Sequence, residues 1–144
     1  MKRPYKTARC ILYRDDHYLL AVHNRYWGGR QRWGLPGGQV ERGESPRAAA
    51  ARELNEELRL RDPKLEEVGA YRYKGALHMV YAAPLAGDVH DFDTVELLDI
   101  GWFTEPAVAR LGAEARLHAR YEIDAIRRLR AQLECGAPRA AASF

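Results

Sequence analysis

One short segment, Gly38 to Leu60, constrains this chain more than any other. It contains the hexapeptide RELNEE at positions 52–57. On a helix, Glu53, Glu56 and Glu57 occupy positions i, i+3 and i+4, so their carboxylates share one face. The like charges of Glu53 and Glu57 oppose helix formation by roughly a few tenths of a kcal/mol, and the last turns of a helix favour cations instead. Bound Mg²⁺ or Mn²⁺, which prefer oxygen ligands, would remove both penalties.

The residues before this face predict how the helix begins. Leu35 to Glu41 is typical of a turn that enters a short strand, and positions 42–44 form a loop. Ser45 is a suitable N-cap, and Pro46 suits the first helical position. The alanines at 48–51 give the helix a slim face that can pack close to a sheet.

This spacing resembles the signature of the Nudix (MutT-like) hydrolases. The signature is a Gly, five residues, a Glu, seven residues, and then Arg-Glu-apolar-any-Glu-Glu-any-Gly-apolar. The matching positions are Gly38, Glu44, Arg52, Glu53, Leu54, Glu56, Glu57 and Leu60. The one departure is Arg59, where the family has a Gly that permits a left-handed helix end. We therefore expect the helix to extend by part of a turn or to leave by a different loop.

The resemblance implies a fold, a reaction and a set of metal ligands. The fold is α/β, a Nudix-type α/β/α sandwich with a mixed central sheet, whose layout covers about residues 5–112. The reaction is Mg²⁺-dependent (or Mn²⁺-dependent) hydrolysis of a diphosphate linkage. The substrate is a nucleoside triphosphate or another nucleoside diphosphate linked to a further moiety. The implied metal ligands are the carbonyl of Gly37 and the carboxylates of Glu53, Glu56 and Glu57.

The resemblance also implies which residues of the signature accept a proton and which orient the site. Glu53 or another carboxylate would accept a proton from the attacking water. Arg52 can reach Glu56 on the same helix face, so it would orient the site. Glu44 would orient the site as well or bind an outer metal ion, unless it only favours the helix N-terminus as an acidic residue.

The acidic loop from Gly87 to Val95 supplies another candidate. Nudix enzymes commonly place an extra ligand or base in this region. Glu96, at the junction of this loop with the next strand, is the first choice for a catalytic role. His90 is the second, because an imidazole titrates near neutral pH. The alternative is a loop whose charges are simply solvated.

Substrate recognition is less readable. Arg25, Arg30 and Arg32 precede the signature and can meet phosphates. Base stacking can involve Tyr81, with Trp27, Tyr71 and Tyr73 as further aromatic candidates. There is no SQPWPFPxS-like segment of the NADH type, and the coenzyme-A pattern is incomplete. The Pro that ADP-ribose enzymes have beyond the signature is replaced by Gly75-Ala76. The absences favour a nucleoside triphosphate or a small nucleoside diphosphate derivative.

Length and composition predict one domain over residues 1–136, with a flexible tail at 137–144. The hydrophobic content of 47% and charged content of 30% are ordinary for a soluble globule. No apolar run is long enough to span a membrane, and the start has no stretch of signal-peptide type. Cys10 and Cys135 are far apart and form no CxxC pair. We therefore expect a cytoplasmic monomer or homodimer that does not bind membranes and takes a nucleotide substrate.

Hydrophobic alternation predicts strands at 7–14, 17–23, 68–74, 77–84 and 97–103. A short helix is predicted at 105–111, and a long amphipathic helix at 114–134 that ends because of Gly136 and Pro138.

Two other functions compete with hydrolysis. One is a catalytically inactive Nudix-fold sensor that binds a nucleotide, although such proteins usually lose signature carboxylates and this chain retains them. The other is a nucleic-acid binder that uses the arginines between 116 and 130. Those arginines alternate with acidic residues, which is more typical of a salt-bridged helix surface than of a basic stripe.

Overall fold

The computed structural model describes residues 4–24 and 31–142, with side chains described as far as residue 136. Every strand predicted from the sequence is present, with ends that differ by two residues or fewer. The elements, in chain order, are β1 (Thr7–Arg14), β2 (His17–His23), β3 (Trp33–Gly34), β4 (Gly37–Gln39), α1 (Pro46–Leu58), β5 (Glu66–Tyr73), β6 (Ala76–Pro84), β7 (Leu97–Thr104), α2 (Glu105–Ala113) and α3 (Glu122–Ala142).

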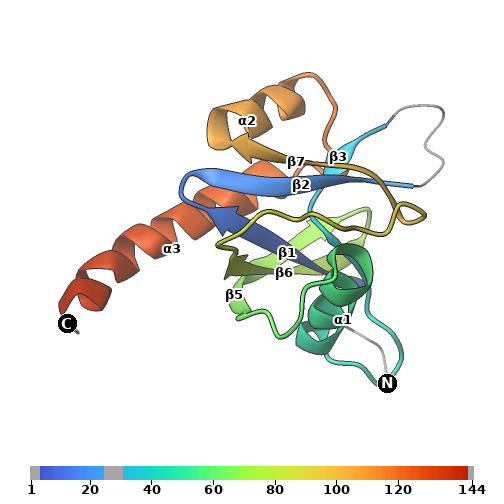
Figure 1. Cartoon of the computed structure of the whole chain (residues 1–144), viewed down its shortest axis with the longest axis horizontal. Coiled ribbons are helices and arrows are strands. Elements are labelled where there is room, and N and C mark those ends of the chain that lie inside the picture. Colours follow the sequence, from blue (N-terminus) through green and yellow to red (C-terminus); the bar gives the residue numbers. More distant parts are fainter. Residues whose placement is uncertain (1–3, 25–30, 143–144) are drawn as a thin grey trace.

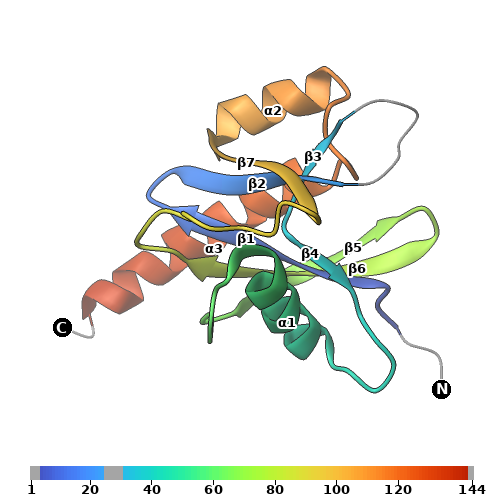
Figure 2. The ribbon, with the colours of Figure 1, turned by 45° about the vertical axis from the view of Figure 1, so that its right-hand side comes forward.

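The strands form one mixed sheet, which confirms the predicted α/β class. The order along the sheet is β3-β2-β1-β6-β5, with β4 paired to β1 and β7 paired to β2. Only β1 and β6 run parallel among the described pairs. Helix α1 covers one face of the sheet, and α2 and α3 lie on the other side (Figures 1 and 2). None of the helices within the described residues is long and apolar enough to cross a membrane.

The alternation of β1 divides the core between these two sides. Ile11 belongs to the cluster that contains Ile126 and Leu129 of α3. Cys10 and Leu12 belong to the cluster beneath α1. Because successive side chains of a strand point to opposite faces, a strand buried on both faces is apolar at nearly every position. This two-sided burial fixes α1 against the centre of the sheet.

The segment before α3 is a loop, so the predicted helix start at Glu114 is wrong. Ala115 and Arg120 have φ values of 56° and 74°, which lie in the left-handed region and interrupt a right-handed helix. Between them, Leu117 forms a parallel bridge with Trp33. Pairing with β3 therefore replaces helical hydrogen bonds in this loop.

The predicted end of the same helix is also wrong, because α3 runs on to Ala142 past Gly136 and Pro138. A glycine disfavours a helix by only about 1 kcal/mol relative to alanine. Alanine, the best helix former, occupies positions 140–142. The division into a domain at 1–136 and a flexible tail stays a prediction.

Arg59 overturns the predicted exit of α1. Its φ of 58° and ψ of 25° place it in the left-handed conformation that the family's Gly would adopt. The backbone N–H of Arg59 donates to the carbonyl of Asn55 over 3.0 Å. Its side-chain Nη1 donates to the carbonyl of Glu56 over 2.7 Å. The side chain thus satisfies a carbonyl at the helix C-terminus, where a cation is favoured, and the helix ends without an extra turn.

Candidate functional site

The start of α1 is built as the sequence predicts. Ser45 is extended, and its hydroxyl accepts a hydrogen bond from the N–H of Ala48 over 3.1 Å. Pro46 occupies the first turn. Ala49 and Ala50 are fully buried against the sheet. Since small side chains allow close approach, they bring the following carboxylates to the edge of β4.

Two glycines let β4 pass close to these carboxylates. A Cβ on Gly38 would lie 2.5 Å from the carboxyl group of Glu53. Gly37 has a φ of 138°, which L residues rarely adopt, and its Cβ would lie 2.3 Å from the carbonyl oxygen of Ala8. Neither position tolerates a side chain without movement of the backbone or of Glu53.

A cavity of about 240 Å³ lies between β4, α1 and the start of β7. It brings together the predicted carboxylates of Glu53, Glu56, Glu57 and Glu96. The complete lining is His23, Gly37, Gly38, Gln39, Glu41, Glu53, Glu56, Glu57 and Glu96. A concave site with converging acidic groups is able to hold a cation beside an anionic substrate.

Glu57 is the most deeply buried of these carboxylates, with 2% of its surface exposed. Its Oε1 accepts a hydrogen bond from the N–H of Gly37 over 3.0 Å. Its Oε2 lies 3.1 Å from Nε2 of His23. These two contacts join α1 to β4 and β2, and they hold the carboxylate in one orientation.

Arg52 connects the other carboxylates. Its strongest partner is Glu44, whose two oxygens accept from Nε over 2.7 Å and from Nη2 over 3.0 Å. Its Nη1 donates to Glu53 over 3.0 Å and to Glu56 over 3.3 Å. Nη2 also donates to the carbonyl of Gln39 over 3.0 Å. One guanidinium therefore ties the loop before α1 and the strand β4 to the carboxylate face.

Burial and the charges of this network shift the pKa values of Glu53 and Glu44 in opposite directions. Burial, and next the charge of Glu57, raise the pKa of Glu53, although Arg52 opposes both effects. The hydrogen bond from Arg52 lowers the pKa of Glu44. The pKa of Arg52 is raised, first by its hydrogen bond to Glu44. A half-buried carboxylate with a raised pKa, close to other carboxylates, is suited to accept a proton or to bind a cation.

The acidic loop reaches the site, as expected. The N–H of Asp93 donates to the carbonyl of Glu57 over 2.9 Å, so the loop rests on the end of α1. The N–H of Asn24 donates to the carbonyl of Glu96 over 2.8 Å. Glu96 lines the cavity, whereas His90 is exposed and is not among the lining residues. The geometry thus favours the first choice over the second.

Among the described residues, neither Arg32 nor Tyr81 of the predicted substrate-binding set lines the carboxylate cavity. Arg25 and Arg30 lie outside the described residues, as does Trp27. Arg32 lines a different hollow. Tyr81 is 4% exposed and packs beneath α1, with the guanidinium of Arg47 5.1 Å from its ring centre. Its ring is therefore part of the core and is not exposed for stacking on a nucleotide base.

Two residues of the site were missed from the sequence. These are His23 and Arg9. Arg9 is a residue of β1 and is 4% exposed. Nη1 of Arg9 donates to the carbonyl of Gly37 over 3.0 Å. A carbonyl oxygen has two lone pairs, so this bond leaves one for a metal ion. The signal for Arg9 was a cation between the apolar residues Ala8 and Cys10 of a strand, which indicates a buried partner.

The donor set suits a hard divalent metal ion in its chemistry, because oxygen ligands from five carboxylates line one cavity. In the conformation described, however, no three acidic, histidine or cysteine side chains among residues 4–24 and 31–136 are grouped closely enough to hold one. Arg52 occupies the space between Glu53 and Glu56 through its hydrogen bonds.

The sequence is similar to known proteins of one family. The family model described as NUDIX domain matches residues 3–124. The NAD-capped RNA hydrolase NudC of Edwardsiella ictaluri is 35% identical over 119 residues, which are 77% of this chain but only 46% of that protein. Diphosphoinositol polyphosphate phosphohydrolase 2 of Rattus norvegicus is 32% identical over 124 residues, covering 81% of this chain and 68% of that protein.

A solved structure shows the same fold. The NUDIX domain of Shewanella oneidensis NrtR, solved with ADP ribose, matches with a TM-score of 0.71 at 20% identity, over 92% of this chain and 90% of that chain. With the family model covering most of the sequence and the signature carboxylates meeting in one cavity, the chain belongs to the NUDIX domain family.

Proposed function

We propose that this chain is a Mg²⁺-dependent hydrolase that cleaves the diphosphate linkage of a nucleoside triphosphate or of another nucleoside diphosphate derivative. The observation that carries the proposal is a cavity lined by five carboxylates, with Gly38 packed against Glu53. The two relatives named above are hydrolases of different substrates. NAD and diphosphoinositols both contain a phosphoanhydride, so the relatives support this bond type without selecting the rest of the molecule.

The chain's own residues divide the work. Glu53, Glu56 and Glu57, with the carbonyl of Gly37, would hold the metal ion. When bound, Mg²⁺ supplies positive charge to the diphosphate oxygens and lowers the pKa of bound water. Glu53 or Glu96 accepts the proton of the attacking water, since both line the cavity. Arg52 is a positioning residue, because it contacts the carboxylates rather than the reacting atoms.

The competing functions make different predictions. A nucleotide sensor would bind without turnover, but none of the signature carboxylates is replaced here. Nucleic-acid binding by α3 is disfavoured because Arg127 and Arg130 pair with Glu105 of α2, at 3.4 and 3.0 Å. Arg116 and Arg120, also considered for that role, precede α3. The cationic surface is therefore partly neutralised and is not continuous along one helix.

The test is a screen of nucleoside triphosphates, dinucleotides and nucleotide sugars with Mg²⁺, in which products are identified by mass. We expect cleavage within a diphosphate and loss of turnover with EDTA. Tight binding without products from any compound would support the sensor instead. For variants of the cavity carboxylates, such as Glu57→Gln, the control is Glu67→Gln. Glu67 is an exposed carboxylate of β5 that does not line the cavity.

A further inference from the structure

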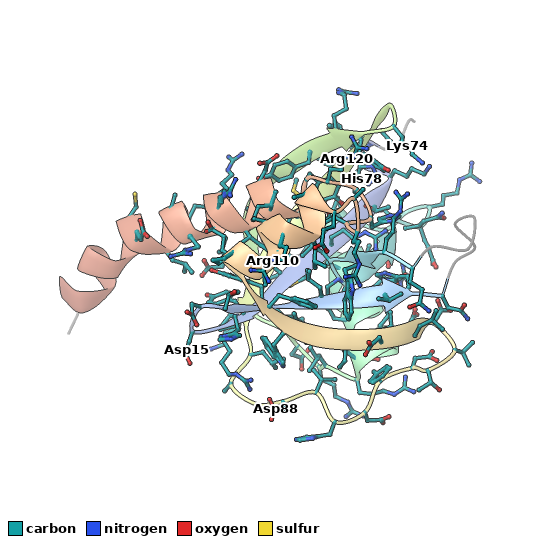
Figure 3. The ribbon with its side chains drawn as sticks, turned by 90° about the horizontal axis from the view of Figure 1, so that it is seen from above. Asp15, Lys74, His78, Asp88, Arg110 and Arg120 are labelled. Atoms are coloured by element: carbon teal, nitrogen blue, oxygen red, sulfur yellow. The ribbon has the colours of Figure 1, made fainter. Side chains whose placement is uncertain are left out.

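A second hollow, of about 490 Å³, lies where the hairpin of β5 and β6 meets the start of α3. Four cationic side chains and one carboxylate line it, so its net charge is positive. The lining residues are Arg32, Arg72, Tyr73, Lys74, Ala119, Arg120, Tyr121 and Asp124. Figure 3 shows Lys74 and Arg120 close together at this end of the molecule, away from Asp15 and Asp88. Such a concave cationic surface attracts anions.

Two of the cations stand on left-handed backbone. Lys74 has a φ of 50° and Gly75 a φ of 74°, so these two residues form the tight turn of the hairpin. Gly, Asn or Asp are the usual choices at the Lys74 position of such a turn. Arg120 has a φ of 74°. Backbone outliers occur preferentially at functional sites, and here both outliers present a cation to the same hollow.

One residue that lines the hollow, Arg32, has a buried polar atom without a partner in the described part of the chain. Nε of Arg32 is buried and makes no hydrogen bond to any described residue. Buried donors are nearly always satisfied in folded proteins, so the guanidinium of Arg32 retains hydrogen-bonding capacity. A phosphate oxygen is an acceptor that suits a guanidinium.

The aromatic rings of the hollow are already engaged. Tyr121 stacks on Tyr71 at 5.4 Å and on His78 at 5.7 Å between ring centres. Lys74 lies over the ring of Tyr73 at 5.5 Å, whose hydroxyl donates to the carbonyl of His118 over 3.2 Å. The hollow therefore favours a phosphate group over a stacked base.

A third hollow, of about 480 Å³, lies next to both this region and the carboxylate cavity. It shares Gln39 with the carboxylate cavity and Arg72 with the cationic hollow. Lys6 adds another cation to the lining of the third hollow. Arg32 and Gly37 are five residues apart, so their Cα atoms are separated by at most about 17 Å. A single extended substrate can thus span both ends.

From these observations we infer that the cationic hollow binds a second phosphate group of the substrate, beyond the diphosphate that is cleaved. The preferred substrates are then small molecules that carry an additional phosphate on the leaving or retained group. The inference rests on the proposed diphosphate hydrolysis for its substrate, but anion binding at the hollow is measured without turnover.

The first experiment titrates inorganic tripolyphosphate into the protein by calorimetry, with EDTA present so that no metal ion bridges the carboxylates. We expect binding to be about tenfold weaker in the Arg72→Gln/Arg120→Gln double variant, since two charged contacts are lost. Arg61→Gln/Arg110→Gln is the matched control, because both arginines are exposed and line neither the cationic hollow nor the carboxylate cavity. Thermal unfolding confirms that both double variants fold.

Three outcomes overturn the inference. These are no binding by the unmodified protein, equal weakening in both double variants, and tighter binding of a short single-stranded RNA than of tripolyphosphate. The last would assign the hollow to nucleic acid.

The second experiment links the hollow to the substrate. Tripolyphosphate should inhibit hydrolysis of the nucleotide found by the screen competitively, with an inhibition constant raised about tenfold in Arg72→Gln/Arg120→Gln. An unchanged inhibition constant would contradict the proposed substrate path. If the screen finds no hydrolysis at all, the proposed function fails, and the EDTA titration still decides whether the hollow binds phosphate.

Discussion

The backbone N–H of Gly37 donates to Oε1 of Glu57 over 3.0 Å, which makes one carboxylate both a structural link and a candidate metal ligand. Glu57→Gln preserves this bond, because an amide oxygen also accepts, but it removes the negative charge. We expect kcat with Mg²⁺ to fall at least about a hundredfold. The melting temperature should change little. Full turnover by this variant at ordinary Mg²⁺ would exclude Glu57 as a ligand.

Glu96 offers a prediction about the reaction itself. It lines the cavity from the loop that rests on α1 through Asp93. If Glu96 activates water, Glu96→Gln should lower kcat about a hundredfold and leave KM nearly unchanged, because the interaction is strongest in the transition state. Steady-state kinetics with the confirmed substrate measure this split. Asp88→Asn is the control, since Asp88 pairs with Arg14 instead of lining the cavity. Equal rates for Glu96→Gln and the unmodified enzyme would leave Glu53 as the base candidate.

Because Arg59 adopts the left-handed conformation at the end of α1, its backbone strain can be tested by substitution. Arg59→Gly relieves backbone strain of about 1 kcal/mol but loses the side-chain bond to Glu56. Arg59→Ala loses the same bond and keeps the strain. Arg59→Gly should therefore melt about 3 °C higher than Arg59→Ala. Equal melting temperatures, measured by circular dichroism, would show that the left-handed backbone carries no penalty at this position.

Local signals were enough to predict most of the fold and the carboxylate face of α1. Ser45 and Pro46 define a helix start through their own backbone preferences, and the apolar alternation of β1 is read from neighbouring positions. The carboxylate face follows from helix spacing alone. These features depend on residues within a turn or two of each other, so the sequence displays them directly.

The contacts that were missed join distant parts of the chain. His23 and Glu57 are 34 positions apart, and Arg9 and Gly37 are 28 apart. Their pairing depends on strand order, which local patterns do not specify. Arg59 was mispredicted for a different reason. Arginine disfavours the left-handed conformation, but here the Arg59 side chain donates to the carbonyl of Glu56 and supports it. The start of α3 likewise depended on the bridge between Trp33 and Leu117.

Glu122, at the start of α3, predicts how stability depends on pH. It is 1% exposed. Its Oε2 accepts from the N–H of Ala119 over 2.9 Å, and its Oε1 has no partner among the described residues. Burial raises the pKa of Glu122, although backbone hydrogen bonds and Arg9 oppose this. For a carboxyl group with a raised folded-state pKa, the stabilisation is complete below the unfolded-state pKa and is lost as pH rises toward the folded-state pKa.

Glu122→Gln removes this titration while keeping an acceptor for Ala119. At about pH 3, more than one unit below the ordinary pKa of a glutamate, the unmodified protein is mostly protonated at this site in both states. Its free energy of unfolding relative to the variant should then be at its highest. As pH rises, the unfolded chain ionises first, so the unmodified protein should lose stability relative to Glu122→Gln and reach a plateau above the folded-state pKa. Urea unfolding at several pH values measures the difference, with the exposed Glu134→Gln as control. A difference that stays constant with pH would show that Glu122 titrates normally, and that the buried environment of α3 does not penalise its charge.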